Sequence, residues 1–172
     1  MTPGTLNVTI YDRELHIEVT GGGIHTLPVG PLTLLAGALS DGDPPPPASL
    51  TNALGLVHDH LDDLLIAAPS IAASPVVVIA GTHAEAMARV EIGSADIPTD
   101  YELLRADADE VFRTLAVESA PERRHNPGLP DDHVESIVAT CCVILGIMRR
   151  LDLRSLRIST EPARSTRDET KS

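Results

Sequence analysis

Three residues that follow a continuous apolar run have the types needed to contact an anion. The run Val76 to Ala80 is typical of a strand covered on both faces, and Gly81, Thr82 and His83 come directly after it. Ligands of α/β sheets bind at the carboxyl ends of the strands, where glycine lets the backbone approach an oxyanion closely. We therefore predict that Gly81, Thr82 and His83 form the best candidate for an anion contact.

Two other groups of ionisable side chains could do chemistry, but each has a simpler interpretation. His58 and Asp62 are spaced i,i+4, on one face of a helix, which is a spacing that metal ligands use. The solvated face of an acidic helix explains them equally well, so we predict no metal site. Glu14 and Glu18 could form a hydrolytic carboxylate pair, although such residues are more often the exposed side of a half-buried sheet.

The cysteines and the basic cluster are also interpreted without catalysis. Cys141 and Cys142 are adjacent in an apolar helix that disfavours the thiolate, so we expect buried thiols rather than a nucleophile. Arg123, Arg124 and His125 form one basic cluster in an acidic chain. This cluster could meet a polyanion, but we interpret it as surface charge beside a loop. No catalytic residue is predicted.

Composition excludes several functional classes. The 172 residues predict a single domain, and the formal net charge of -12 repels a phosphate backbone, so we expect no nucleic-acid partner. The only aromatic residues besides histidine are Tyr11, Tyr101 and Phe112, too few for base stacking. No apolar run is long enough for a membrane helix, and the start lacks a signal peptide, so we expect no membrane contact and a cytoplasmic location.

The elements that must position these residues follow from the hydrophobic period. Period-two alternation predicts three strands at 6–11, 15–19 and 24–27, joined by turns at Asp12-Arg13 and at the glycines 21–23. Helical spacing then predicts a helix at 32–39, a second helix from Ser49 or Thr51 as N-cap to residue 68, and a short helical stretch after residue 83. Two more helices are expected, at 100–118 and from Asp131 or Asp132 as N-cap to residue 150. A closing strand is expected at 153–158. This order indicates a mixed sheet flanked by helices, with a polar tail at 160–172 that we predict to be disordered.

The order of these elements and several local strings resemble the second half of the Ppx/GppA family, the exopolyphosphatases and guanosine pentaphosphate phosphohydrolases. The strings are Leu27-Pro28-Val29-Gly30, Asp43 followed by Pro44 to Pro47, Ala80-Gly81-Thr82, Pro121 to Arg124 with Pro127-Gly128-Leu129, and the segment from Asp132 to Ser159. No single string is specific, and the shared order over residues 6–159 carries the resemblance. It implies an α/β fold, one actin-like ATPase (ribonuclease H-like) half-domain at 1–159 with an N-terminal three-stranded antiparallel meander, followed by the tail at 160–172.

The resemblance also implies where this chain departs from the family. Family members hold phosphate with glycine-rich turns from two halves, and the glutamate that activates water lies in the first half, to which nothing here corresponds. Their Asp-x-Gly-Gly-Gly-Ser turn is replaced by Thr9 to Glu14, which has no glycine, and Gly21 to Gly23 lie one strand too late. Gly81 and Thr82 preserve part of the second phosphate turn, but Ala84 and Glu85 follow, and a carboxylate repels phosphate. The third cleft segment reads Ala139 to Cys142 instead of small glycines.

Two functional hypotheses remain open. The first is a half-length, catalytically inactive Ppx/GppA-like protein that acts as a binding or interaction module or a weak anion binder, without a cofactor. The second is a hydrolase of polyphosphate or guanosine pentaphosphate whose cleft is completed by a first-half partner protein or by a homodimer, and which would then use Mg²⁺. A gene remnant without a task is a third reading of the same features.

Overall fold

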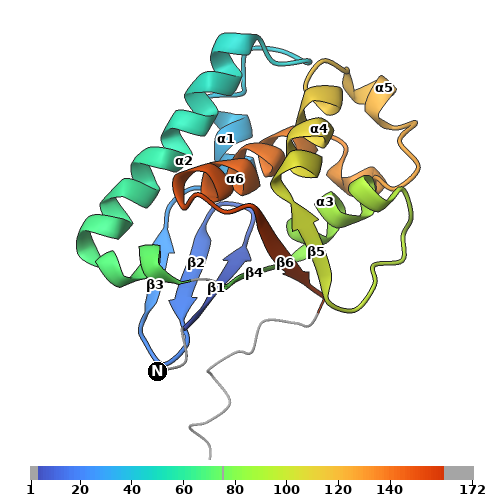
Figure 1. The fold of residues 1–172 in the computed structure, drawn as a ribbon. Coiled ribbons are helices and arrows are strands. Elements are labelled where there is room, and N and C mark those ends of the chain that lie inside the picture. Colours follow the sequence, from blue (N-terminus) through green and yellow to red (C-terminus); the bar gives the residue numbers. More distant parts are fainter. Residues whose placement is uncertain (1–3, 75, 161–172) are drawn as a thin grey trace, which may run out of the picture.

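The computed structural model describes residues 4–74 and 76–160 of the chain. Within them the chain forms one six-stranded mixed sheet with the strand order β3-β2-β1-β4-β6-β5. The helices lie above this sheet in the view of Figure 1, and the meander forms its left edge. The strands are β1 (Thr5–Ile10), β2 (Leu15–Val19), β3 (Ile24–Leu27), β4 (Val76–Ala80), β5 (Tyr101–Leu104) and β6 (Ser155–Ser159).

The first three strands form the predicted antiparallel meander. Strand β1 pairs with β2 so that Val8 faces Ile17, and β2 pairs with β3 so that Leu15 faces Leu27. The glycines 21–23 form the turn between β2 and β3, as the spacing predicts. This register places the apolar side chains of alternate positions on one face, where they are buried.

Three strands of the sheet run parallel. Strand β4 pairs in parallel with β1 on one side and with β6 on the other. Their carboxyl ends therefore meet at one edge of the sheet, which puts the residues after β1 beside those after β4.

The segment 100–118 is not the single helix that its apolar spacing predicts. Residues Tyr101–Leu104 form the edge strand β5, which pairs antiparallel with β6, and only Arg105–Leu115 is helical. Leu103 faces Leu156 across this pair and is fully buried. The pairing with a strand about fifty residues later overrides the local helical pattern.

One helix organises the core. All residues from Ile137 to Met148 of α6 are buried, and α6 packs against α1, α2, α3 and α4. Such a helix, apolar on all sides, belongs in the centre of a domain. The helices are α1 (Pro31–Ala36), α2 (Pro47–Ala67), α3 (Thr82–Ile92), α4 (Arg105–Leu115), α5 (Ala120–Arg123) and α6 (Ile137–Arg150), with short 3-10 turns at Pro69–Ala73 and Asp131–His133.

The predicted helix caps are wrong. Helix α2 starts one turn earlier than expected, with Pro46 as N-cap, so Ser49 lies inside the helix and is buried. Asp131 and Asp132 belong to the 3-10 turn, and Ser136 is the N-cap residue of α6. Proline at the first helical position supplies the fixed φ that starts α2 without a side-chain cap.

The described residues cover only one face of the sheet. In β4, Val77 and Ile79 are buried, whereas Val76 is 38% exposed and Val78 and Ala80 are half-buried. The prediction that this strand is covered on both faces is therefore wrong for the part of the chain that the structure describes. The fold class itself, an α/β half-domain with an N-terminal meander, is confirmed.

The proposed boundary after residue 159 stays a prediction, because nearly all of the expected tail, residues 161–172, lies outside the described residues.

Among the helices that are described, none is both long enough and apolar enough to cross a bilayer.

Candidate functional site

A hollow of about 720 Å³ lies at the carboxyl ends of β1 and β4. We name it the β1–β4 hollow, and two chain segments make most of its wall: residues 9–14 at the end of β1, and Gly81, Thr82 and His83 with Glu85 at the start of α3. Thr160 after β6 completes the lining. The hollow lies where ligands of open α/β sheets bind.

The turn after β1 is held by one hydrogen bond within the turn and one from α1. The backbone N–H of Tyr11 donates to the carbonyl of Glu14 at 3.0 Å, and the N–H of Leu32 donates to the carbonyl of Asp12 at 2.8 Å. Gly30 packs directly on this turn, since a Cβ at position 30 would lie 2.7 Å from the backbone carbonyl oxygen of Asp12. This turn therefore presents side chains, and the Tyr11 amide is not free to receive an oxyanion.

The turn after β4 requires a glycine. Gly81 has a φ of 113°, and a Cβ at this position would lie 2.6 Å from the carbonyl oxygen of Ile10. Gly81 is also the N-cap of α3 and has no side chain to satisfy the first amides of the helix. Such a helix start favours negative charge through its free N–H groups.

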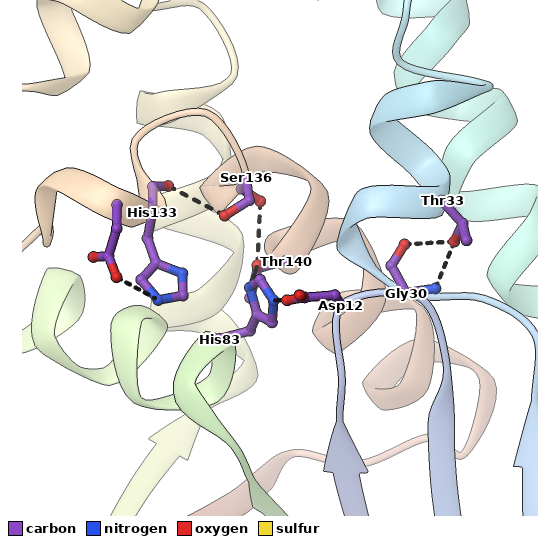
Figure 2. Close-up of polar contacts among 8 residues, drawn as sticks. Asp12, Gly30, Thr33, His83, His133, Ser136 and Thr140 are labelled. Atoms are coloured by element: carbon purple, nitrogen blue, oxygen red, sulfur yellow. Dashed lines mark hydrogen bonds and ion pairs between the residues drawn. The ribbon is translucent and has the colours of Figure 1, made fainter.

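The structure brings together the three predicted residues and adds an internal partner for one of them. Thr82 is exposed at the hollow, but the side chain of His83 turns inward and His83 is only 4% exposed. Its Nε2 lies 2.7 Å from Oδ1 of Asp12, whose own side chain is 67% exposed (Figure 2). The anion-binding role of Gly81, Thr82 and His83 stays a prediction, but a carboxylate already occupies the polar face of His83.

The second nitrogen of His83 points towards α6. Its Nδ1 lies 3.5 Å from Oγ1 of Thr140, and that hydroxyl donates at 3.2 Å to the carbonyl of Ser136. With its own hydrogen directed to Ser136, the Thr140 oxygen can accept from the imidazole, while Asp12 accepts from the other nitrogen. Each ring nitrogen of His83 thus has a side-chain oxygen within hydrogen-bond distance.

A second buried histidine stacks on the first. The rings of His83 and His133 meet edge to face with centroids 4.9 Å apart. Burial lowers the pKa of His133, and the neighbouring His83 lowers it further, while Asp132, 4.0 Å away, opposes this change. Its Nδ1 is buried without a hydrogen-bond partner among the described residues. The environment of His133 therefore favours the neutral ring.

Acidic side chains dominate the charge of the hollow. Asp12, Glu14 and Glu85 line it, against one arginine, Arg13, and the histidine already paired with Asp12. Glu14 also lies 2.8 Å from His16. A phosphate group entering this hollow would meet more negative than positive charge.

The other sequence candidates lie elsewhere or are occupied. Glu18 is paired with Asn7 in the register of the meander and does not line the β1–β4 hollow, so it forms no carboxylate pair with Glu14 there. Both cysteines are buried, which raises the pKa of each thiol, in agreement with the expectation of inert thiols. Asp62 pairs with Arg150, and nowhere in residues 4–74 and 76–160 do three His, Cys, Asp or Glu side chains form a group able to hold a metal ion.

The interpretation of Arg123 as surface charge is wrong. Arg123 is 3% exposed and its Nη2 lies 2.9 Å from Oδ1 of Asp43. Its Nε and Nη1 donate to the carbonyls of Val134 and Glu118. Arg124 and His125 beside it are exposed, as expected. No local signal distinguishes the three, since the partners of Arg123 come from other elements.

Sequence reasoning also missed the contact between Asp12 and His83. The two residues are 71 positions apart and only the sheet topology joins them. The one available signal is that both residues directly follow predicted strands, and ligands of α/β sheets bind at the carboxyl ends of strands.

Comparison with known proteins identifies the fold. No protein-family model matches the sequence, and no curated protein matches it significantly. Solved structures do match. The type II variant structure of the Aquifex aeolicus Ppx/GppA phosphatase aligns with a TM-score of 0.79 at 15% identity, over 92% of this chain and 53% of that one.

Two further structures give the same result. An exopolyphosphatase-like protein aligns with a TM-score of 0.80 at 14% identity, over 92% of this chain and 55% of that one. An exopolyphosphatase from Cytophaga hutchinsonii aligns with a TM-score of 0.71 at 15% identity, over 93% and 54%. The chain thus spans about half the length of the structures it matches, and the resemblance seen in the sequence is confirmed at the level of the fold.

Proposed function

We propose that this domain is a binding or interaction module built on a Ppx/GppA-like half-fold, and that it does not hydrolyse phosphoanhydrides. The observation that carries this proposal is the contact between Asp12 and His83 at 2.7 Å. It puts a carboxylate at the point of the fold where an oxyanion would need donors.

The charge of the β1–β4 hollow supports this proposal. Binding of a phosphate group requires amide donors or basic side chains, and catalysis requires that these donors face the charge that develops in the transition state. Here the Tyr11 amide is used within the turn, and three carboxylates line the wall. Any oxyanion held by Gly81, Thr82 and His83 would therefore be held weakly.

The start of α3 supports the same conclusion. A free helix N-terminus attracts an anion, but Glu85 lies in the first turn of α3 and Asp12 contacts the second residue of the helix. These carboxylates supply the negative charge that the helix dipole favours. The positive end of α3 is thus compensated from within the chain.

The alternative is a hydrolase of polyphosphate or guanosine pentaphosphate with a cleft completed by a first-half partner or by a second copy. The location of the hollow favours it, because an open space of about 720 Å³ at the strand ends is large enough for a phosphorylated ligand. In that case Mg²⁺ would be needed to neutralise the phosphates, since the hollow itself cannot.

A phosphate-release assay separates the two proposals. Purified protein is incubated with polyphosphate and, separately, with guanosine pentaphosphate in the presence of Mg²⁺, and inorganic phosphate is measured over time. The interaction module predicts no release above the protein-free control. Turnover that disappears in the Asp12→Ala variant would refute the proposal and favour the hydrolase, and light scattering on the same sample would show whether a dimer forms the active species.

A further inference from the structure

A second, smaller hollow of about 280 Å³ lies away from the strand ends. We name it the α5 hollow. It lies between α1, the connection that leads into α2, the short helix α5 and the start of α6, and Figure 1 shows that this connection reaches towards α5. Its apolar lining consists of Leu35, Leu39, Pro45, Ala120 and Val138.

The polar wall of the α5 hollow is held in place by a buried arginine. The guanidinium of Arg123 pairs with Oδ1 of Asp43, and Oδ2 of Asp43 accepts from the backbone N–H of Ala120 at 2.7 Å. Two further donors of Arg123 are bonded to the carbonyls of Val134 and Glu118. These contacts join three chain segments, so the hollow is preformed and its arginine is already neutralised.

Glu135 differs from the other charged residues of this wall. It is exposed, and it makes no hydrogen bond or ion pair with any residue that the structure describes. Asp43, although paired, keeps 43% of its side chain exposed. Glu135 therefore puts one negative charge on the rim of an apolar hollow, and no described residue pairs with it.

We propose that the α5 hollow docks an apolar side chain from a basic segment of a partner protein. A volume of about 280 Å³ lies just below the range of small-molecule sites, about 300 Å³ and above, and fits one anchoring side chain. The exposed Glu135 then faces a lysine or arginine beside that anchor. This inference rests on the proposed function, because it names the partner chemistry of the interaction module.

The net charge of the chain selects between possible occupants. A second copy would bring another formal charge of -12 to an acidic rim, so charge repulsion disfavours self-association through this hollow. A basic partner is attracted both at long range and at the rim, and such complementarity raises the association rate. In this arrangement the apolar side chain of the partner is buried in the α5 hollow, and the lysine or arginine residues beside it orient the segment on the acidic rim.

The test uses a fluorescein-labelled peptide in which one leucine lies between pairs of lysines, titrated with the full chain and followed by anisotropy. A control peptide carries serine in place of leucine. Glu135→Lys reverses the charge at the rim, and Asp63→Lys is the matched control for net charge. Asp63 is exposed on α2, sixteen positions beyond its first residue, which is about 24 Å along the helix.

The expected result is saturable binding of the leucine peptide. The dissociation constant should rise about tenfold or more for the serine peptide and about tenfold for Glu135→Lys, with less than a twofold change for Asp63→Lys. In a ¹H–¹⁵N NMR titration, the amides of Leu35, Ala120 and Glu135 should shift. Equal weakening by both charge reversals, indifference to serine, shifts confined to the β1–β4 hollow, or dimerisation through the α5 hollow would each overturn the inference.

This experiment and the phosphate-release assay fail independently. Phosphate release would refute the proposed function while leaving the peptide result readable. Absence of peptide binding at the α5 hollow, with no phosphate release, would overturn only the identity of the docking site.

Discussion

Two aspartates on loops each contact a buried side chain that is distant in sequence, His83 for Asp12 and Arg123 for Asp43, and the two contacts have different effects. Asp12 meets His83 at the mouth of the β1–β4 hollow, and Asp43 meets Arg123 in the wall of the α5 hollow. Arg123 uses three of its nitrogens, on one carboxylate and two carbonyls. His83 has one short contact, to Asp12, and one long contact, to Thr140.

The Asp43–Arg123 pair stabilises the fold, whereas the Asp12–His83 pair contributes mainly to the charge of the candidate site. An arginine keeps its charge at all physiological pH values, and its removal would leave buried acceptors unpaired, so the Asp43–Arg123 pair holds the fold together. The Asp12–His83 pair has a mostly exposed carboxylate and contributes less to stability. Its carboxylate adds negative charge to the β1–β4 hollow, beside Glu14 and Glu85.

Replacing the buried arginine is expected to have the largest effect on stability. Arg123→Met should lower the free energy of unfolding by about 3 kcal/mol, because two carbonyls and a carboxylate lose their donor. Urea unfolding followed by circular dichroism measures this change. The neighbouring Arg124 is exposed, so Arg124→Met serves as the control and should change stability by less than about 0.5 kcal/mol. Equal effects of the two substitutions would contradict the structural role of Arg123.

Replacing Asp43 should lower the stability more than replacing Asp12. Asp43→Ala is expected to lower the free energy of unfolding by about 2 kcal/mol. Both carboxylate oxygens of Asp43 have a donor, and without them the buried Arg123 has no counter-charge. Asp12→Ala is expected to cost less than about 1 kcal/mol, since its side chain is largely in solvent. The same urea titrations compare them. An Asp12 variant as unstable as the Asp43 variant would remove the distinction between the two pairs.

Titration of His133 should change the stability by less than the substitutions above, and only as the pH changes. Burial and the adjacent His83 lower the pKa of His133, so the unfolded chain binds more protons than the folded one just below the ordinary histidine pKa of about 6.5. Stability should therefore fall as the pH drops through this value. His133→Phe keeps an aromatic ring against His83 and removes the titration, so its melting temperature should fall less than that of the native chain between about pH 7.5 and pH 5.5. Parallel melting curves for the two proteins would contradict this assignment.

Much of the fold could be predicted because its signals are local. Alternation gives the strands of the meander, a β-branched run gives β4, and an apolar stretch gives α6. Strand β5 could not be predicted in this way, because Leu103 and Leu104 also fit a helical spacing and the strand is only four residues long. Its pairing with β6 depends on the whole intervening chain.

The position of the candidate site could be predicted from the sequence, but the contacts and burial of its side chains could not. The strand order places Gly81, Thr82 and His83 at a ligand-binding edge, and the sequence already shows that Asp12 to Glu14 contain no glycine. The inward turn of His83, its contact with Asp12 and the burial of Arg123 all depend on residues from distant elements. Local patterns carry no information about such contacts.

The most direct test of the central claim is an NMR titration of the chain with pyrophosphate, observed at the amides of Thr82, His83 and Ala84. We predict that the native chain binds weakly, without saturation at millimolar pyrophosphate, and that Asp12→Asn, which removes one negative charge beside the helix start, binds about tenfold more tightly. Saturation of the native chain at micromolar pyrophosphate, or no gain in affinity in Asp12→Asn, would contradict the account.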